Sequence, residues 1–292
     1  MFCLKTTLKL HNLNVVVQEA NFKSYKSFNK ALFLVQKVET FTENIARFIH
    51  FHTNLTIEQV QLLNVVEILI ILLEIRILSL GNAINIMVDT TKPPAHSPQE
   101  GEEVEKKYTA YNKSAAIMQK DLLDILKQEH LTIEDFNVKL KSPTLQECGT
   151  DELHTHHFVD WIEYKNVKTS FYEIDKKDAF ENLPFLIHDN LLAKINDYIR
   201  IFEDIILVDI ENFDENTKDV KIQFSYSYDF IIHLIKLMFS NNLITLHENL
   251  FRMSQFAHID LNYLDNCTPG EVFLYMKLLE ADIHEKNTRN QS

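Results

Sequence analysis

Glycine is unusually scarce in this sequence. The 292 residues include only four glycines, at positions 81, 101, 149 and 270, where average usage of about 7 % would give about 20. Glycine supplies positive φ and lets the backbone approach a ligand closely. Phosphate loops, dinucleotide turns and nucleophile elbows depend on it, and no GxGxxG, GxxxxGK[ST] or GxSxG motif occurs. P-loop ATPases, Rossmann enzymes, α/β-hydrolases and turn-rich all-β folds are therefore disfavoured.

Arginine is also scarce, and basic residues as a whole are outnumbered. The chain has 42 acidic and 29 basic residues, which gives a formal net charge of −13 at pH 7. Only five of the basic residues are arginine, the side chain that binds phosphates and guanine edges with two parallel hydrogen bonds. Because nucleic acids attract clustered positive charge, a nucleic-acid partner is disfavoured. A basic protein partner fits this surface better.

Cysteine is rare, and no apolar run is long. The three cysteines lie far apart without a CxxC pair, which is typical of reduced thiols in the cytoplasm. The N-terminal residues lack a continuous apolar stretch and a small-residue cleavage site, so no classical signal peptide is expected. The most apolar segment, 61–88, is interrupted by Glu67, Glu74 and Arg76, which are costly in a bilayer. We therefore expect no transmembrane segment and predict a buried central helix here, opened by a capping box at Thr56.

Helical spacing dominates the first part of the chain. Apolar residues from Phe28 to Ile49 recur on one helical face, and a short connection to the next apolar segment predicts an antiparallel helical hairpin. Three of the six prolines fall within 91–103, which predicts an exposed linker. We expect an N-terminal helical bundle over 1–92, a linker over 93–102 and a larger α+β region over 103–292.

The region beyond residue 103 mixes helices with a small β element. Aromatic and β-branched segments between 158 and 174 predict a β-hairpin, and alternation over 220–228 predicts another strand. Periodicity predicts helices over about 102–130, 184–207, 229–241, 244–258 and 269–286, the last opened by a capping box. The expected fold class is therefore mainly α, a helical bundle with a small β-hairpin or sheet in the C-terminal half.

Potential metal ligands are concentrated in one short segment. They are Cys148, Asp151, Glu152, His154, His156, His157 and Asp160. These side-chain types bind zinc or iron, although their spacing matches neither HExxH nor a di-iron helix pair. The candidate ligands of a divalent metal are His154, His156 and Asp160, because residues two apart on a strand face the same side. A solvated polar loop is the alternative interpretation.

The order helix, β-hairpin, helix, strand between 115 and 228 resembles the core of the PD-(D/E)xK nuclease superfamily. The resemblance assigns its two acidic residues to Asp160 in FVDWIEY and Glu173 in FYEIDKK. It implies metal-assisted hydrolysis of a phosphodiester, with the carboxylates holding Mg²⁺ and Lys176 orienting the water. Asp175 stands where the family has lysine, and Lys176 is expected on the opposite side of the strand. A small sheet with solvent-facing charges is the alternative.

Two Arg–His spacings resemble those of HEPN-type helical ribonucleases. They are Arg47 with His52, at the end of one predicted helix, and Arg252 with His258 on another. The resemblance implies cleavage of RNA by an arginine and a histidine brought together across a homodimer. Arg47 is followed by Phe48, where that family has a polar residue. Helix-terminal histidines favoured by the helix dipole are the alternative interpretation.

No serine or cysteine lies in a recognisable nucleophile motif, so the leading hypothesis is non-enzymatic. It is an acidic, mostly helical module that binds a protein partner. The composition and the polar tail LLEADIHEKNTRNQS also resemble effector proteins of intracellular bacteria. That resemblance implies a cytoplasmic location or delivery into a host cell by a non-classical route. The metal-dependent nuclease and the HEPN-like ribonuclease are the alternatives.

Overall fold

The computed structural model divides into two units. Unit 1 comprises Met1–Asn82, Thr144–Thr150 and Ile232–Ser292, and unit 2 comprises Ala83–Pro143 and Asp151–Ile231. The structure describes residues 3–10, 13–34, 37–89, 91, 108–126, 130–133, 135–149, 153–164, 167–170, 182–210, 220–239 and 243–289. The predicted linker over 93–102 lies outside the described residues, and the predicted domain boundaries stay a prediction.

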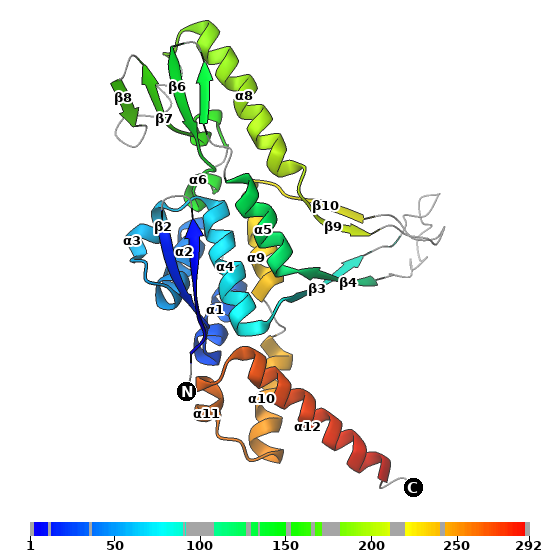
Figure 1. Cartoon of the computed structure of the whole chain (residues 1–292). Coiled ribbons are helices and arrows are strands. Elements are labelled where there is room, and N and C mark those ends of the chain that lie inside the picture. The colour runs from blue at the N-terminus through cyan, green and yellow to red at the C-terminus, as the bar shows by residue number, and fades with distance from the viewer. Residues whose placement is uncertain are drawn as a thin grey trace. The chain divides into compact units, whose positions relative to one another are not determined.

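Unit 1 is mainly helical and carries one β-hairpin near its N-terminus (Figure 1). The hairpin pairs β1 (Lys5–Leu10) with β2 (Leu13–Gln18) in antiparallel register, Lys5 opposite Gln18. The helices are α1 (Phe22–Leu34), α2 (Val38–His52), α3 (Ile57–Leu62), α4 (Val65–Leu80), α6 (Leu145–Cys148), most of α9 (Tyr228–Phe239), α10 (Leu243–Phe256), α11 (Leu261–Asn266) and α12 (Pro269–Arg289).

Helix α4 is the centre of unit 1. Thr56 and Asn64 each form a reciprocal capping box, so that α3 and α4 begin where their side chains accept backbone N–H groups. Almost every residue of α4 from Val65 to Ile75 is buried, which confirms the predicted buried helix. Among the helices in the described part of the chain, none is long and apolar enough to cross a bilayer.

Helix α4 ends earlier than the sequence analysis predicted, because Gly81 follows it and buried and exposed residues alternate beyond that glycine. Gly81 has φ +86°, a conformation that favours glycine, and the chain then continues as β3 (Ala83–Asp89). Ile84 and Ile86 are buried while the residues between them are exposed, which is the period of a strand. The expected helix over 61–88 is thus corrected to a short α3, the central α4 and a strand.

Unit 2 contains two hairpins and a four-stranded antiparallel sheet (Figure 1). Strand β3 pairs with β4 (Tyr108–Ser114), and β9 (Ile206–Ile210) pairs with β10 (Val220–Gln223). The sheet has the order β5 (His130–Ile133), β6 (Phe136–Leu140), β7 (Val159–Tyr164) and β8 (Val167–Ser170). Among the described residues, unit 2 also contains the helices α5 (Ala115–Ile125) and α8 (Phe185–Glu203) and the 3₁₀ helix η1 (Thr155–Phe158).

The fold class is α+β with more helix than strand, as predicted, but the strands are not confined to the C-terminal half. The hairpins β1–β2 and β3–β4 belong largely to the first 114 residues. The expected helix over 102–130 is wrong at its start, where β4 precedes α5, and the helical spacing from Phe28 to Ile49 is divided between α1 and α2. The β7–β8 hairpin and the three C-terminal helices α9, α10 and α12 confirm the sequence pattern.

Candidate functional site

Unit 1 contains a pocket of about 790 Å³ beside α1 and α2. That volume suits a drug-sized ligand. Phe28, Phe48 and Phe51 give it an apolar part, and the first two rings stack with centroids 3.9 Å apart. The polar lining includes Gln18, Glu19, Asn21, Lys23, Ser24, Ser27, Asn44, Arg47, His52, Asn266 and Thr268. The pocket therefore combines an aromatic surface with hydrogen-bonding groups.

Ser24 and His52 form the closest side-chain pair in this lining. The Ser24 Oγ and His52 Nε2 atoms are 2.6 Å apart. Ser24 lies in the first turn of α1, where its N–H donates to the Asn21 side chain, and His52 is the last residue of α2. His52 is only 5 % exposed. Its Nδ1 is buried with no hydrogen-bond partner of normal geometry among the described residues.

Burial controls the charge of His52. Removing the imidazolium from water lowers the pKa of His52 from 6.5 to about 4, and the backbone of Glu19 offsets part of this effect. The ring is therefore neutral near pH 7. With its proton on Nδ1, it leaves Nε2 free to accept the hydroxyl proton of Ser24.

Arg47 and His52, one of the two HEPN-like pairs, line this same pocket. The Arg47 guanidinium is exposed and pairs with Glu43 at 2.6 Å, one turn earlier in α2. The other pair, Arg252 and His258, lies at the end of α10 and in the loop after it, where both side chains are exposed. The homodimer that the HEPN hypothesis requires stays a prediction.

The residues of the nuclease hypothesis are only partly described. Asp160 lies on β7, and its carboxylate accepts an ion pair from Lys139 of the neighbouring strand β6 at 2.9 Å. Glu173 and Lys176 lie outside the described residues. The structure therefore gives Asp160 a basic partner, and the nuclease assignment of Glu173 and Lys176 stays a prediction.

The predicted metal ligands His154 and His156 lie at a 3₁₀ turn rather than on a strand, with His154 as the N-cap of η1 and His156 inside it. Their ring centroids lie 5.3 Å apart, and the His157 ring stacks on that of His154 and is tilted against that of His156. The backbone N–H of His154 donates to Nδ1 of His157 at 3.0 Å, which occupies one of the available nitrogens. In the described ranges, no three His, Cys, Asp or Glu side chains are grouped so that they could hold a metal ion. The metal site at His154, His156 and Asp160 therefore stays a prediction.

The buried cysteines are poor nucleophiles. Burial raises the pKa of Cys148 to about 12 and also raises the pKa of Cys267. The thiolate is the reactive form of cysteine, so neither thiol is activated near pH 7. All three cysteines are free, and Cys3 is exposed at the rim of the pocket in unit 1.

A second candidate site is a group of exposed apolar side chains on the C-terminal helices of unit 1. We define the C-terminal apolar surface by Phe251, Phe256, Leu261, Tyr263, Leu274 and Leu278, all between 46 % and 67 % exposed. Leu274 and Leu278 are one turn apart on α12 and share a face. The Tyr263 hydroxyl lies 3.3 Å from that of Tyr275, which brings α11 beside α12.

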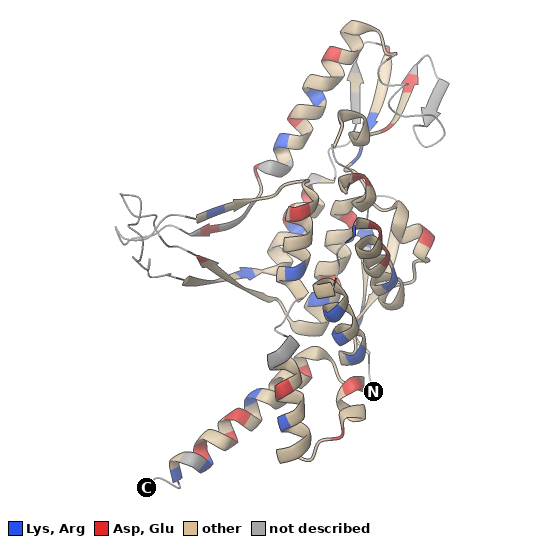
Figure 2. Ribbon diagram, turned by 180° about the vertical axis from the view of Figure 1, so that it is seen from behind, with Lys and Arg blue, Asp and Glu red and all other residues tan. Residues whose placement is uncertain are grey.

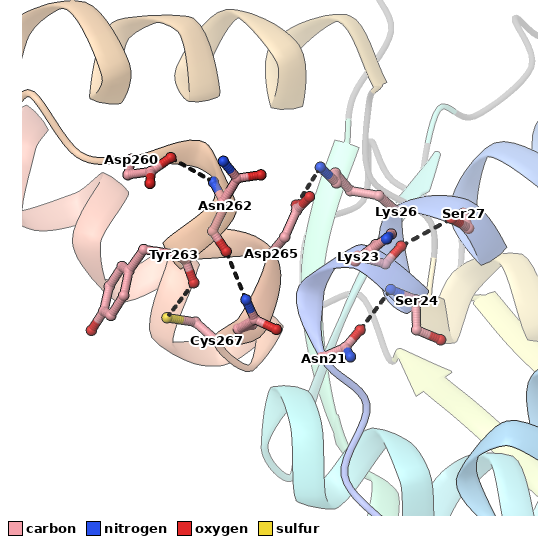
Figure 3. A network of polar contacts seen from close by, with 11 residues as sticks. Asn21, Lys23, Ser24, Lys26, Ser27, Asp260, Asn262, Tyr263, Asp265 and Cys267 are labelled. Atoms are coloured by element: carbon pink, nitrogen blue, oxygen red, sulfur yellow. Dashed lines mark hydrogen bonds and ion pairs between the residues drawn. The ribbon is translucent and has the colours of Figure 1, made fainter. Parts of the chain in front are cut away.

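The helices that carry this surface are firmly attached to α1 and α4. Lys26 of α1 pairs with Asp265 of α11 (Figure 3), and the Phe22 N–H donates to the Cys267 carbonyl. The Phe273 ring of α12 meets the Phe22 ring edge-on. A Cβ on Gly270 would lie 3.0 Å from the Ser79 carbonyl oxygen, so the start of α12 approaches the end of α4 closely. The exposed apolar side chains thus stand on a fixed support.

The sequence analysis did not identify the Ser24–His52 pair. The two residues are 28 positions apart, and no motif connects them. A local signal existed only for Ser24, because Asn21 three residues earlier is a common helix N-cap. Comparison with protein-family models, with curated proteins and with solved structures found no significant match. The protein is thus characterised by its α+β fold and by the two candidate sites of unit 1.

Proposed function

We propose that the protein is an interaction module that binds another protein through the C-terminal apolar surface. One observation carries the proposal. Of the 17 large hydrophobic residues exposed in the described part of the chain, six lie between residues 251 and 278. Exposed apolar patches mark protein-binding surfaces, and Leu274 and Leu278, one turn apart on α12, give this group a shared face. Tyrosine and phenylalanine, which supply three of the six, are enriched at interfaces.

Charge favours a partner with apolar and basic side chains. Residues 243–289 contain seven acidic and four basic residues, a net charge of −3. Figure 2 marks acidic and basic residues interspersed along α12. The pairs Lys286–Asp282 and Arg289–Glu285 lie within its last turns. A second copy of the chain brings another net charge of −13, which opposes self-association. A different, basic protein is therefore the occupant we propose.

Affinity capture from cells that naturally make the chain tests this function. The test variant is Leu274→Asp with Leu278→Asp, and its control is Lys277→Ser with Glu280→Ser, on exposed positions of the same helix. A central interface residue contributes more than about 1.4 kcal/mol, so we expect at least a tenfold loss of captured partner with the test variant only. A partner captured equally by both variants would contradict the proposal.

The nuclease and the HEPN-like ribonuclease are not proposed as functions. Asp160 is paired with Lys139, and Arg47 of the first HEPN-like pair is paired with Glu43. Delivery into a host cell likewise stays a prediction from composition. The interaction module rests on the exposure of named apolar side chains.

A further inference from the structure

The pocket of unit 1 has a chemical character that protein binding at the C-terminal apolar surface does not explain. It brings a serine hydroxyl within 2.6 Å of a buried imidazole nitrogen. Both residues face a cavity of about 790 Å³ with a partly aromatic lining. A nucleophile in hydrogen-bond contact with a base, beside a cavity that admits a ligand, is the basic arrangement of covalent acyl transfer.

We propose that Ser24 and His52 form a serine–histidine dyad that accepts an acyl group from an ester with an apolar acyl chain. The Ser24 Oγ attacks the ester carbonyl carbon while its proton passes to His52 Nε2. The electron pair of the C=O bond moves to the oxygen. When the C=O bond re-forms, the ester C–O bond breaks and the alcohol leaves with the proton from His52. Water then attacks the acyl carbon while one of its protons passes to His52 Nε2. The bond between the acyl carbon and Oγ breaks, Ser24 Oγ takes the proton from His52, and the carboxylic acid is released.

The surroundings of Ser24 favour the negative charge that develops on the carbonyl oxygen. Ser24 is in the first turn of α1, where the helix dipole presents positive potential. The Lys23 side chain also lines the pocket, and no acceptor for the Lys23 backbone N–H occurs among the described residues. Such donors stabilise an oxyanion. Phe51, which is 68 % exposed, offers the apolar chain an aromatic surface in the same cavity, and the buried rings of Phe28 and Phe48 lie behind it.

His52 sets the expected rate. Its imidazole is neutral near pH 7 and available as a base, but the low pKa of His52 makes it a weak one. Glu19, Lys23, Arg47 and Cys3 are the other titratable groups of the lining. Covalent labelling of Ser24 by an activated reagent is therefore the informative readout, since it needs only a single turnover.

The experiment uses the full chain and an alkyl fluorophosphonate as the probe. The reagent forms an Oγ–P bond with an activated serine and releases fluoride, and the hydroxyl proton is taken by the base. Intact-mass spectrometry follows the adduct with time, and peptide mapping locates it. We expect one adduct per chain, on Ser24.

Three variants make the test specific. Ser24→Ala is expected to abolish the adduct, and His52→Gln to slow its formation at least 100-fold, within the range of general-base catalysis. Ser27→Ala is the matched control, because Ser27 lines the same pocket on the same helix and its hydroxyl donates to the Lys23 carbonyl. It is expected to react at the wild-type rate.

Several results would overturn the dyad. They are no adduct on the wild-type chain, an adduct on another residue, and an adduct formed at the same rate with His52→Gln. The first two need no variant, so a folding defect in a variant cannot hide them. The outcome is also independent of partner capture by the C-terminal apolar surface, because Leu274 and Leu278 are not among the residues that line the pocket.

Discussion

Helices α4 and α12 belong to the same unit but use their apolar residues in opposite ways. Of the 16 residues of α4, 11 are buried, including the consecutive run Ile68 to Leu73. In the 21-residue α12, Val272 and Met276 are buried, while Leu274 and Leu278 are more than half exposed. A helix that is apolar on every side must be surrounded by protein. The difference separates side chains that stabilise unit 1 from side chains that are available to a partner.

Truncating one leucine in each helix is expected to give the largest difference in the free energy of unfolding. Leu72→Ala in α4 removes a fully buried side chain and is expected to cost about 2–5 kcal/mol of the free energy of unfolding. Leu278→Ala in α12 removes one that is 58 % exposed, with an expected change within about 0.5 kcal/mol. Urea denaturation measures both. Equal losses would mean that α12 is as necessary to the core as α4.

The pH dependence of the free energy of unfolding tests the burial of His52 at the end of α2. The pKa of His52 is about 4 in the folded chain against 6.5 normally, so the unfolded chain binds more protons between these values. The contribution of neutral His52 to the free energy of unfolding is complete above pH 6.5. It is lost as the pH falls from 6.5 to 4, and it stays lost below pH 4. The shift corresponds to about 3 kcal/mol. The difference in unfolding free energy between wild type and His52→Gln, measured from pH 7 to pH 4, should show this slope; a constant difference would disprove the burial.

One basic residue in each helix is expected to differ in the same way in its effect on the free energy of unfolding. Arg76 of α4 is buried and donates from Nε to the Met238 carbonyl at 3.0 Å, and from Nη1 to the Gly81 carbonyl. Hydrogen bonds to charged groups contribute about 1.5–3 kcal/mol each, so Arg76→Met is expected to cost about 2 kcal/mol. Lys277→Met, on an exposed position of α12, is expected to stay within about 0.5 kcal/mol. Thermal and urea unfolding of the two variants decide between this result and equal effects.

Replacing Asn29 of α1 is expected to change the free energy of unfolding by less, and in the stabilising direction. Its side chain is fully buried, and neither amide atom has a hydrogen-bond partner among the residues that the structure describes. Replacing an unsatisfied polar group by an apolar one of similar size removes its desolvation cost. Asn29→Leu is therefore expected to stabilise the protein by about 1 kcal/mol in urea denaturation. Lys30→Leu, at the exposed neighbouring position, is the control; destabilisation by Asn29→Leu alone would contradict the burial of an unpaired amide.

Local sequence signals predicted much of the fold. The capping boxes at Thr56 and Thr268 mark real helix starts, and the apolar run after residue 65 predicted the buried α4. Strands β3 and β4 were missed because Tyr108 and Tyr111 also fit a helical spacing, and because the alternation of Ile84 and Ile86 follows directly on α4. Boundaries between a helix and a strand depend on tertiary packing, which a local pattern does not contain.

The candidate sites were less predictable than the fold. The Ser24–His52 contact joins residues 28 positions apart in separate helices, so only the packing of α1 against α2 creates it. The exposure of Leu274 and Leu278 was equally hidden, since an apolar residue at helical spacing predicts burial. The Ser24–His52 contact and the exposure of these leucines both depend on tertiary packing, which the local sequence pattern does not predict.

Site-specific photocrosslinking tests the central claim most directly. A photoreactive amino acid is placed at Leu278 of the C-terminal apolar surface and, as the control, at Glu58, an exposed position of α3. The protein is irradiated in cells that naturally make it. We predict a discrete, light-dependent adduct with another protein from Leu278 and none from Glu58. The absence of an adduct at Leu278, or the same adduct from both positions, would contradict a binding role for this surface.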